Sequence, residues 1–137
     1  MASLNYPIEA VIASGASVSS AMRLHNPGLV RLVPQHLVIP AAWTAANVTL
    51  QGITTGVTNF IDVNLEGAVA QNAWPWADLF DPFGNEIVIP AAAGRGIVLS
   101  PQDFMGWWAL RVRSGTAAAP VVQAAQRRIW FSHRTFD

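Results

Sequence analysis

The residues of this chain that could carry chemistry are three histidines and one serine–glycine segment. His25, His36 and His133 lie in different segments, without the His-x-x-x-His or His–Glu spacing of metal sites. The segment 14–17, Ser-Gly-Ala-Ser, has neither the spacing nor the lysine of a phosphate loop, and no Gly-x-Ser-x-Gly motif is present. We therefore expect no catalytic residue, no metal, no cofactor and no enzymatic activity.

Four oxygen-bearing residues cluster in the middle of the chain. Asp78, Asp81, Asn85 and Glu86 supply the kind of ligand that calcium binds, but their spacing differs from that of an EF-hand loop. Asp-Pro and Gly-Asn are also common turn formers. We expect a hairpin turn over residues 81–85 rather than a cation site.

Six tryptophans in 137 residues are the strongest aromatic signal. Trp74 and Trp76 lie in a predicted loop, and Trp43 follows a proline. Trp107 and Trp108 are adjacent on a predicted strand, so they must point to opposite faces. We predict Trp108 in the core and Trp107 on a face that something else covers. Such aromatic groups anchor protein interfaces or stack on sugars, and they also serve as lids over a small core.

All eight basic residues are arginines, and lysine is absent. The planar guanidinium suits dry protein interfaces, from which lysine is depleted. Arg111 and Arg113 on one strand, with Arg127 and Arg128 on the last strand, would form a row suited to carboxylates of a partner. A GC-rich genome and a solvated sheet face are the alternative explanations.

The elements that must position these residues are strands, because the apolar pattern has a period of two. Turn residues recur every 8 to 15 positions, and one short helical turn is predicted over residues 100–103. The candidate strands cover residues 8–13, 18–24, 29–33, 37–39, 48–53, 60–65, 79–80, 86–89, 97–99, 107–113 and 127–134. We expect an all-β, single-domain β-sandwich of about eight strands, jelly-roll or immunoglobulin-like, over residues 16–137, with an N-terminal arm over residues 1–15.

Composition points to an assembly. Hydrophobic residues make up 52% and charged residues 12%, which leaves more apolar surface than a monomer usually exposes. The apolar stretches are shorter than the roughly 20 residues of a spanning helix, and no secretory signal is visible. Cysteine is absent and the net charge is zero. We therefore expect no disulfide, no membrane and no nucleic-acid partner.

Three segments resemble small structural proteins of tailed bacteriophages. Residues 104–127 read FMGWWALRVRSGTAAAPVVQAAQR, residues 37–52 read LVIPAAWTAANVTLQG and residues 79–86 read LFDPFGNE. The resemblance covers roughly residues 18–134 and is weakest over residues 52–59. It implies a virion protein made in the bacterial host cytoplasm, namely a capsid decoration (cement) protein on the capsid exterior. The implied partners are the major capsid protein and further copies of the chain, as a dimer or trimer.

Two alternatives remain open. One is a tail, neck or head-fibre base module, and the other is a carbohydrate-binding sandwich that stacks sugars on its tryptophans. The candidate interface residues are Trp43, Trp74, Trp76, Trp107, Arg111, Arg113, Arg127 and Arg128.

Overall fold

The computed structural model describes residues 5–26, 30–54, 74–104 and 106–136, and the structural statements below concern these residues. They contain ten strands and one 3-10 helix. The elements are β1 (Asn5–Ile12), β2 (Met22–Arg23), β3 (His25–Asn26), β4 (Val30–Val38), β5 (Val48–Thr54), β6 (Ala77–Asp78), β7 (Val88–Ile89), β8 (Gly96–Val98), η3 (Pro101–Asp103), β9 (Trp107–Ser114) and β10 (Arg127–Phe136).

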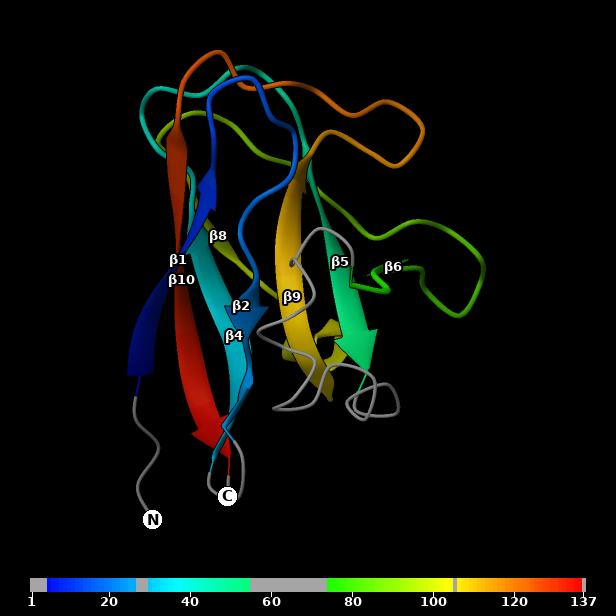
Figure 1. The fold of residues 1–137 in the computed structure, drawn as a ribbon. Coiled ribbons are helices and arrows are strands. Elements are labelled where there is room, and N and C mark those ends of the chain that lie inside the picture. The colour runs from blue at the N-terminus through cyan, green and yellow to red at the C-terminus, as the bar shows by residue number, and fades with distance from the viewer. Residues whose placement is uncertain (1–4, 27–29, 55–73, 105, 137) are drawn as a thin grey trace.

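The strands form two antiparallel sheets that face each other (Figure 1). Sheet A has the order β1-β10-β4-β3, and β8 pairs with β4. Sheet B has the order β2-β9-β5-β6, and β7 pairs with β5. The chain changes sheets repeatedly, because β1, β3, β4, β8 and β10 belong to sheet A whereas β2, β5, β6, β7 and β9 belong to sheet B. The predicted all-β sandwich is confirmed.

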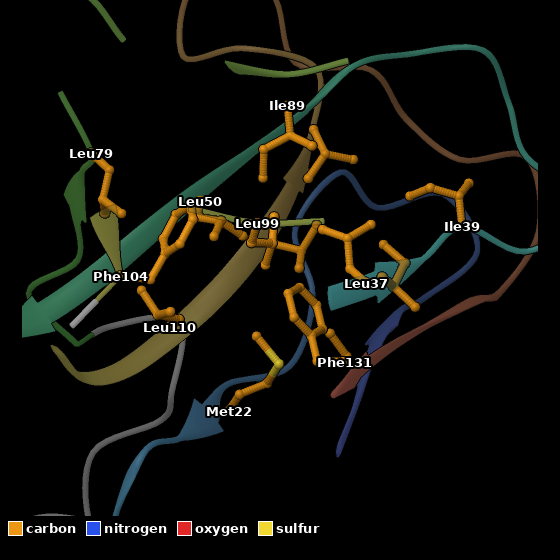
Figure 2. Packing of buried hydrophobic residues seen from close by; sticks show 14 of the residues in the cluster. Met22, Leu37, Ile39, Leu50, Leu79, Ile89, Leu99, Phe104, Leu110 and Phe131 are labelled. Carbon is orange, nitrogen blue, oxygen red and sulfur yellow. The ribbon is translucent and has the colours of Figure 1, made fainter. Parts of the chain in front are cut away.

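The core lies between the sheets because alternate residues of each long strand point inward. Leu37 and Phe131 of sheet A meet Leu50 and Leu110 of sheet B, and all four are buried (Figure 2). Burying each such side chain contributes roughly 1.5–3 kcal/mol. Phe104, which follows η3, closes the cluster beside Leu50 (Figure 2).

Strand β1 includes most of the segment predicted as an N-terminal arm. Residues 5–12 pair with β10 over eight positions, from Asn5 opposite Arg134 to Ile12 opposite Arg127. The start of β1 and the end of β10 therefore lie at the same end of the molecule (Figure 1). Residues 1–4 lie outside the described residues.

Strand β4 is continuous where two strands, 29–33 and 37–39, were predicted. Pro34 lies inside it, opposite His133, while His36 lies opposite Ser132. The register shift between these pairs leaves Gln35 as an extra residue, and such a bulge accommodates a proline that cannot donate to the ladder. The predicted strand 60–65 lies outside the described residues. The helical turn is present as η3, although the Ser100 side chain makes no capping hydrogen bond.

The adjacent tryptophans of β9 lie on the faces opposite to those predicted. Ile53 pairs with Ala109 but Thr54 pairs with Trp107, so Trp108 is the extra residue of a bulge. Trp107 packs against the core between the sheets, where its ring lies over Gly52. Trp108 is buried in a second cluster on the outer face of sheet B. Trp108 is thus buried as predicted, but the faces were predicted wrongly because strict alternation was assumed along the whole strand.

One buried amide joins the loops at one end of the sandwich. The Gln123 Oε1 accepts hydrogen bonds from the Thr44 backbone N–H (2.9 Å) and from Arg127 Nε (3.2 Å). Its Nε2 donates to the Thr44 carbonyl (3.0 Å) and to Ser114 Oγ (2.7 Å). Its backbone N–H donates to the Ala16 carbonyl (3.0 Å). Gln123 is fully buried, and it ties three loops together.

Candidate functional site

The outer face of sheet B carries a row of tryptophan and arginine side chains that contact one another. The Trp74 ring stacks on Trp76 with centroids 5.9 Å apart and meets the edge of Trp108 at 5.7 Å. Arg23 lies 5.0 Å from the centroid of Trp108, and Arg111 lies 4.6 Å from that of Trp76. Two guanidinium groups therefore cap an aromatic row, which is favourable for both cation and ring.

Arg113 lies further along the same face and is buried, with 6% of its surface exposed. Its Nη1 donates to Asp78 Oδ1 (2.8 Å), its Nη2 to Glu86 Oε2 (2.7 Å) and its Nε to Thr49 Oγ1 (3.1 Å). Because Asp78 and Glu86 lie at the two ends of one hairpin, Arg113 clamps that hairpin to sheet B. We predicted that this guanidinium binds carboxylates of a partner protein. It instead binds two carboxylates of the same chain.

Gln51 connects Arg111 to Asp78, the carboxylate that Arg113 also binds. Its Oε1 accepts from Arg111 Nε (2.7 Å), and its Nε2 donates to Asp78 Oδ1 (2.9 Å). Burial would raise the pKa of Asp78, but hydrogen bonds from Gln51 and Arg113 and the positive charges of both arginines outweigh it, so the pKa lies below its usual value. Burial and the nearby charge of Arg113 lower the pKa of Arg111.

The hairpin that Arg113 clamps ends in an exposed aromatic tip. Asp81 Oδ1 accepts hydrogen bonds from the backbone N–H groups of Phe83 and Asn85, both at 2.9 Å. A bridge between Phe80 and Glu86 closes the turn, so the predicted hairpin turn is confirmed. Phe83 is 88% exposed and Phe80 54% exposed. The tip is thus a fixed turn with two exposed phenylalanines, and its backbone lies beyond β6 in Figure 1.

A second apolar surface lies on the outer face of sheet A. It consists of Trp130, Val38 and Val98, which are 48%, 46% and 79% exposed, and is called the sheet A patch below. Trp130 lies directly opposite Val38 in the ladder. Beside it, Arg128 Nη1 pairs with Glu9 Oε1 at 3.1 Å. Exposed apolar groups of this kind mark interaction surfaces when they adjoin one another.

The predicted row of four arginines does not form. Arg111 and Arg113 lie on β9 in sheet B, whereas Arg127 and Arg128 lie on β10 in sheet A. Arg127 turns toward the loops and binds Gln123, and Arg128 pairs with Glu9. The prediction treated neighbouring segments as neighbouring strands, but the chain changes sheets between them.

Among the predicted aromatic residues, Trp74 and Trp76 come together on sheet B, and two do not join them. Trp107 packs against the core, and so does Trp43, whose Nε1 donates to the Ala46 carbonyl (3.1 Å). A sugar platform needs an open ring face. Trp74 is buried and Arg111 lies over Trp76, so these rings already have partners within the chain.

Sequence reasoning missed the tip and the sheet A patch. Phe83 lies in an Asp-Pro-Phe-Gly-Asn turn, where an apolar side chain has no core to enter. The sequence therefore already indicated that Phe83 is exposed. Trp130 alternates with the buried Ile129 and Phe131, which places it outside in the same way. Arg23 gave no such signal, because its ring partner Trp108 faces outward only through the bulge.

A scan against protein-family models and searches of curated proteins and of solved structures found no match to this chain. Among the described residues, no helix is long and apolar enough to cross a membrane. In the same part of the chain, no group of three or more histidine or acidic side chains could hold a metal ion.

Proposed function

We propose that the chain is a virion structural protein of a tailed bacteriophage, a capsid decoration (cement) protein that binds the major capsid shell from the outside. The observation that carries the proposal is the clamped hairpin with Phe83 and Phe80 at its tip. The resemblance over residues 18–134 supports the same role. Such a role requires binding surfaces and no catalytic residue.

The tip suits an anchor because its shape is fixed before binding. Asp81 holds the turn from within, and the ion pairs of Arg113 hold both of its arms. Little conformational entropy is then lost on binding, so more of the gain from burial remains as affinity. Burying one phenylalanine side chain contributes roughly 1.5–3 kcal/mol.

The surroundings of the tip favour a protein pocket over a lipid surface. Loops that bind anionic membranes carry exposed basic residues beside their apolar groups. Here the charged neighbours are Asp81 and Glu86, and the nearby Arg113 is buried and paired. We therefore expect an apolar pocket on a capsid subunit as the partner of Phe83.

The test uses particles of the phage that encodes the chain. Mass spectrometry of purified particles should detect the protein, and gold-labelled antibody should mark the head. Shells that lack the protein should bind the purified chain in co-sedimentation. Phe83→Asp should weaken this binding more than about tenfold, since it removes at least 1.4 kcal/mol of apolar contact.

Val122→Asp is the matched control, because Val122 is also exposed (55%) but lies on a different loop. It should bind like the parent. Protein missing from the particles, or equal binding by the Phe83 variant, would overturn the proposal. Label on the tail would replace it with the tail, neck or head-fibre base module.

A further inference from the structure

The sheet A patch is bordered by both signs of charge. Arg128 and Glu9 lie on the same outer face as Trp130, with Glu9 directly opposite Trp130 and Arg128 two residues before it on β10. Their side chains are 58% and 33% exposed, so both remain open to a partner. The patch therefore offers an apolar centre with one positive and one negative group at its border.

The ladder geometry makes this arrangement self-complementary. In a pleated sheet, neighbouring strands lie about 4.8 Å apart and every second residue of a strand lies about 6.8 Å further along. With the observed register, the line that bisects the Arg128–Glu9 pair at right angles passes within about 2 Å of Trp130, Val38 and Val98. All three residues of the patch thus lie along one line, with the two charges on opposite sides of it.

A rotation by 180° about that line turns the face onto a second copy of itself. The rotation sets Arg128 against Glu9 of the other copy, and Glu9 against its Arg128, while Trp130 meets Trp130 near the axis. Two-fold dimers use one patch twice in this way. Sheets stacked face to face lie about 10 Å apart, which leaves room for interdigitating side chains.

We propose that two copies of this chain form a two-fold dimer by packing the outer faces of their sheets A against each other. The centre of the interface is the sheet A patch, and the four charges of the two Arg128–Glu9 pairs fix its register. The proposal does not rest on capsid binding, which we assign to the tip on the other sheet.

The experiment measures the mass of the full chain by sedimentation velocity over a concentration series. The parent should be a dimer at high concentration. Trp130→Glu should raise the dissociation constant of the dimer more than about thirtyfold, the loss expected for a central tryptophan anchor. Phe83→Glu is the control and should dimerise like the parent.

A charge-reversal pair tests the face and the symmetry together. Glu9→Arg gives a chain with two positive groups at this border, and Arg128→Glu gives one with two negative groups. Each variant alone should be mainly monomeric because like charges meet across the axis. An equimolar mixture should form a heterodimer, and added salt should weaken it.

Thermal melting of each variant first establishes that it is folded. A parent that stays monomeric at all concentrations, or a dimer that Trp130→Glu leaves intact, would overturn the proposal. So would a parent dimer whose two charge variants fail to pair when mixed, since another face would then form the contact. A dimer that does not bind particles would contradict only the proposed function.

Discussion

At the scale of single residues, Gly52 decides which of two adjacent tryptophans enters the core. A Cβ at this position would lie 2.6 Å from Cε3 and 2.8 Å from Cδ2 of Trp107. Only glycine therefore leaves room for that ring between the sheets. The bulge then places Trp108 outside, where Trp74 and Arg23 cover it.

This contact predicts a coupled pair of mutations. Gly52→Ala alone should lower the free energy of unfolding by about 1–3 kcal/mol, because the methyl group displaces the ring. Trp107→Ala alone should cost about 3–5 kcal/mol. In the Trp107→Ala background, Gly52→Ala should cost close to nothing, and urea unfolding of the four proteins measures the difference. Strictly additive losses would show that the ring does not lie over Gly52.

A second residue-scale prediction concerns acid stability. The pKa of Asp78 is lower in the folded chain than its usual value of about 3.9, so its stabilising effect is fully present above that pH and is lost as pH falls through the lower folded value. The free energy of unfolding should therefore fall with pH below about 4, and Asp78→Asn should flatten this dependence. Asp103→Asn, an exposed carboxyl outside the network, is the control. An unchanged slope in the Asp78 variant would contradict the prediction.

The sequence predicted that the two tryptophans of β9 diverge, and it could not predict which one is inside. Alternation follows from the period of a strand, but the bulge depends on how β5 and β9 meet. Arg113 shows the same limit. An arginine at this position predicted that carboxylates bind it, and they do. Only the fold shows that these carboxylates are Asp78 and Glu86 of the same chain.

At the scale of elements, the hairpin between β6 and β7 depends on side chains more than on its ladder. Each of these strands has two residues and pairs only briefly with β5. Arg113 adds two ion pairs to this weak backbone contact, and Glu86 also accepts from the Ala117 N–H at 3.1 Å. One guanidinium thus orders the hairpin and, through Glu86, the neighbouring loop.

Removing that guanidinium should loosen one element and leave the rest in place. Arg113→Met leaves two carboxylates without their partner, and we expect a loss of about 3–5 kcal/mol in the free energy of unfolding. Hydrogen exchange should rise most in residues 77–89. The combined variant Arg113→Met, Asp78→Asn and Glu86→Gln should recover part of the loss because no charge remains unpaired. Unchanged exchange in the hairpin would disprove the clamp.

Most strands could be predicted from the sequence because their apolar pattern has a period of two over most of their length. Residues 48–53 and 107–113 match β5 and β9 closely. The prediction failed at Pro34, where a proline suggested a break but a bulge keeps β4 continuous. Assignment of strands to sheets was beyond reach, since it depends on crossings between layers.

At the scale of the whole molecule, Gln123 closes one end of the sandwich. Both oxygen lone pairs and both N–H groups of its amide have partners, on Thr44, Ser114 and Arg127. A fully satisfied buried amide of this kind fixes the relative position of the loops. Composition gave no hint of it, because glutamine is ordinarily exposed.

Gln123→Met keeps a similar volume and removes these hydrogen bonds. The half-buried backbone groups of Thr44 and the buried hydroxyl of Ser114 then lose these partners, so we expect a loss of about 3 kcal/mol in the free energy of unfolding. Gln126→Met, on the exposed part of the same loop, is the control and should change little. Urea unfolding measures both, and equal stability of the two variants would contradict the role of Gln123.

Apart from the single exposed valines Val88 and Val122, the exposed large apolar side chains of the described residues gather at two places. One is the tip with Phe83, and the other is the sheet A patch on the other sheet. Composition could predict that apolar surface remains exposed, but its position required the fold.

The pairing of β1 with β10 also has a mechanical consequence. The pair of Asn5 and Arg134 lies where β1 begins and β10 nears its end. The ladder runs from this pair to the pair of Ile12 and Arg127. A pulling force on the start of β1 and the end of β10 would load one pair at a time and peel β1 away from that end. Opposed forces directed along the two strands would instead load all eight pairs together. The ladder should therefore resist shear along the strands far better than tension applied at its Asn5–Arg134 end.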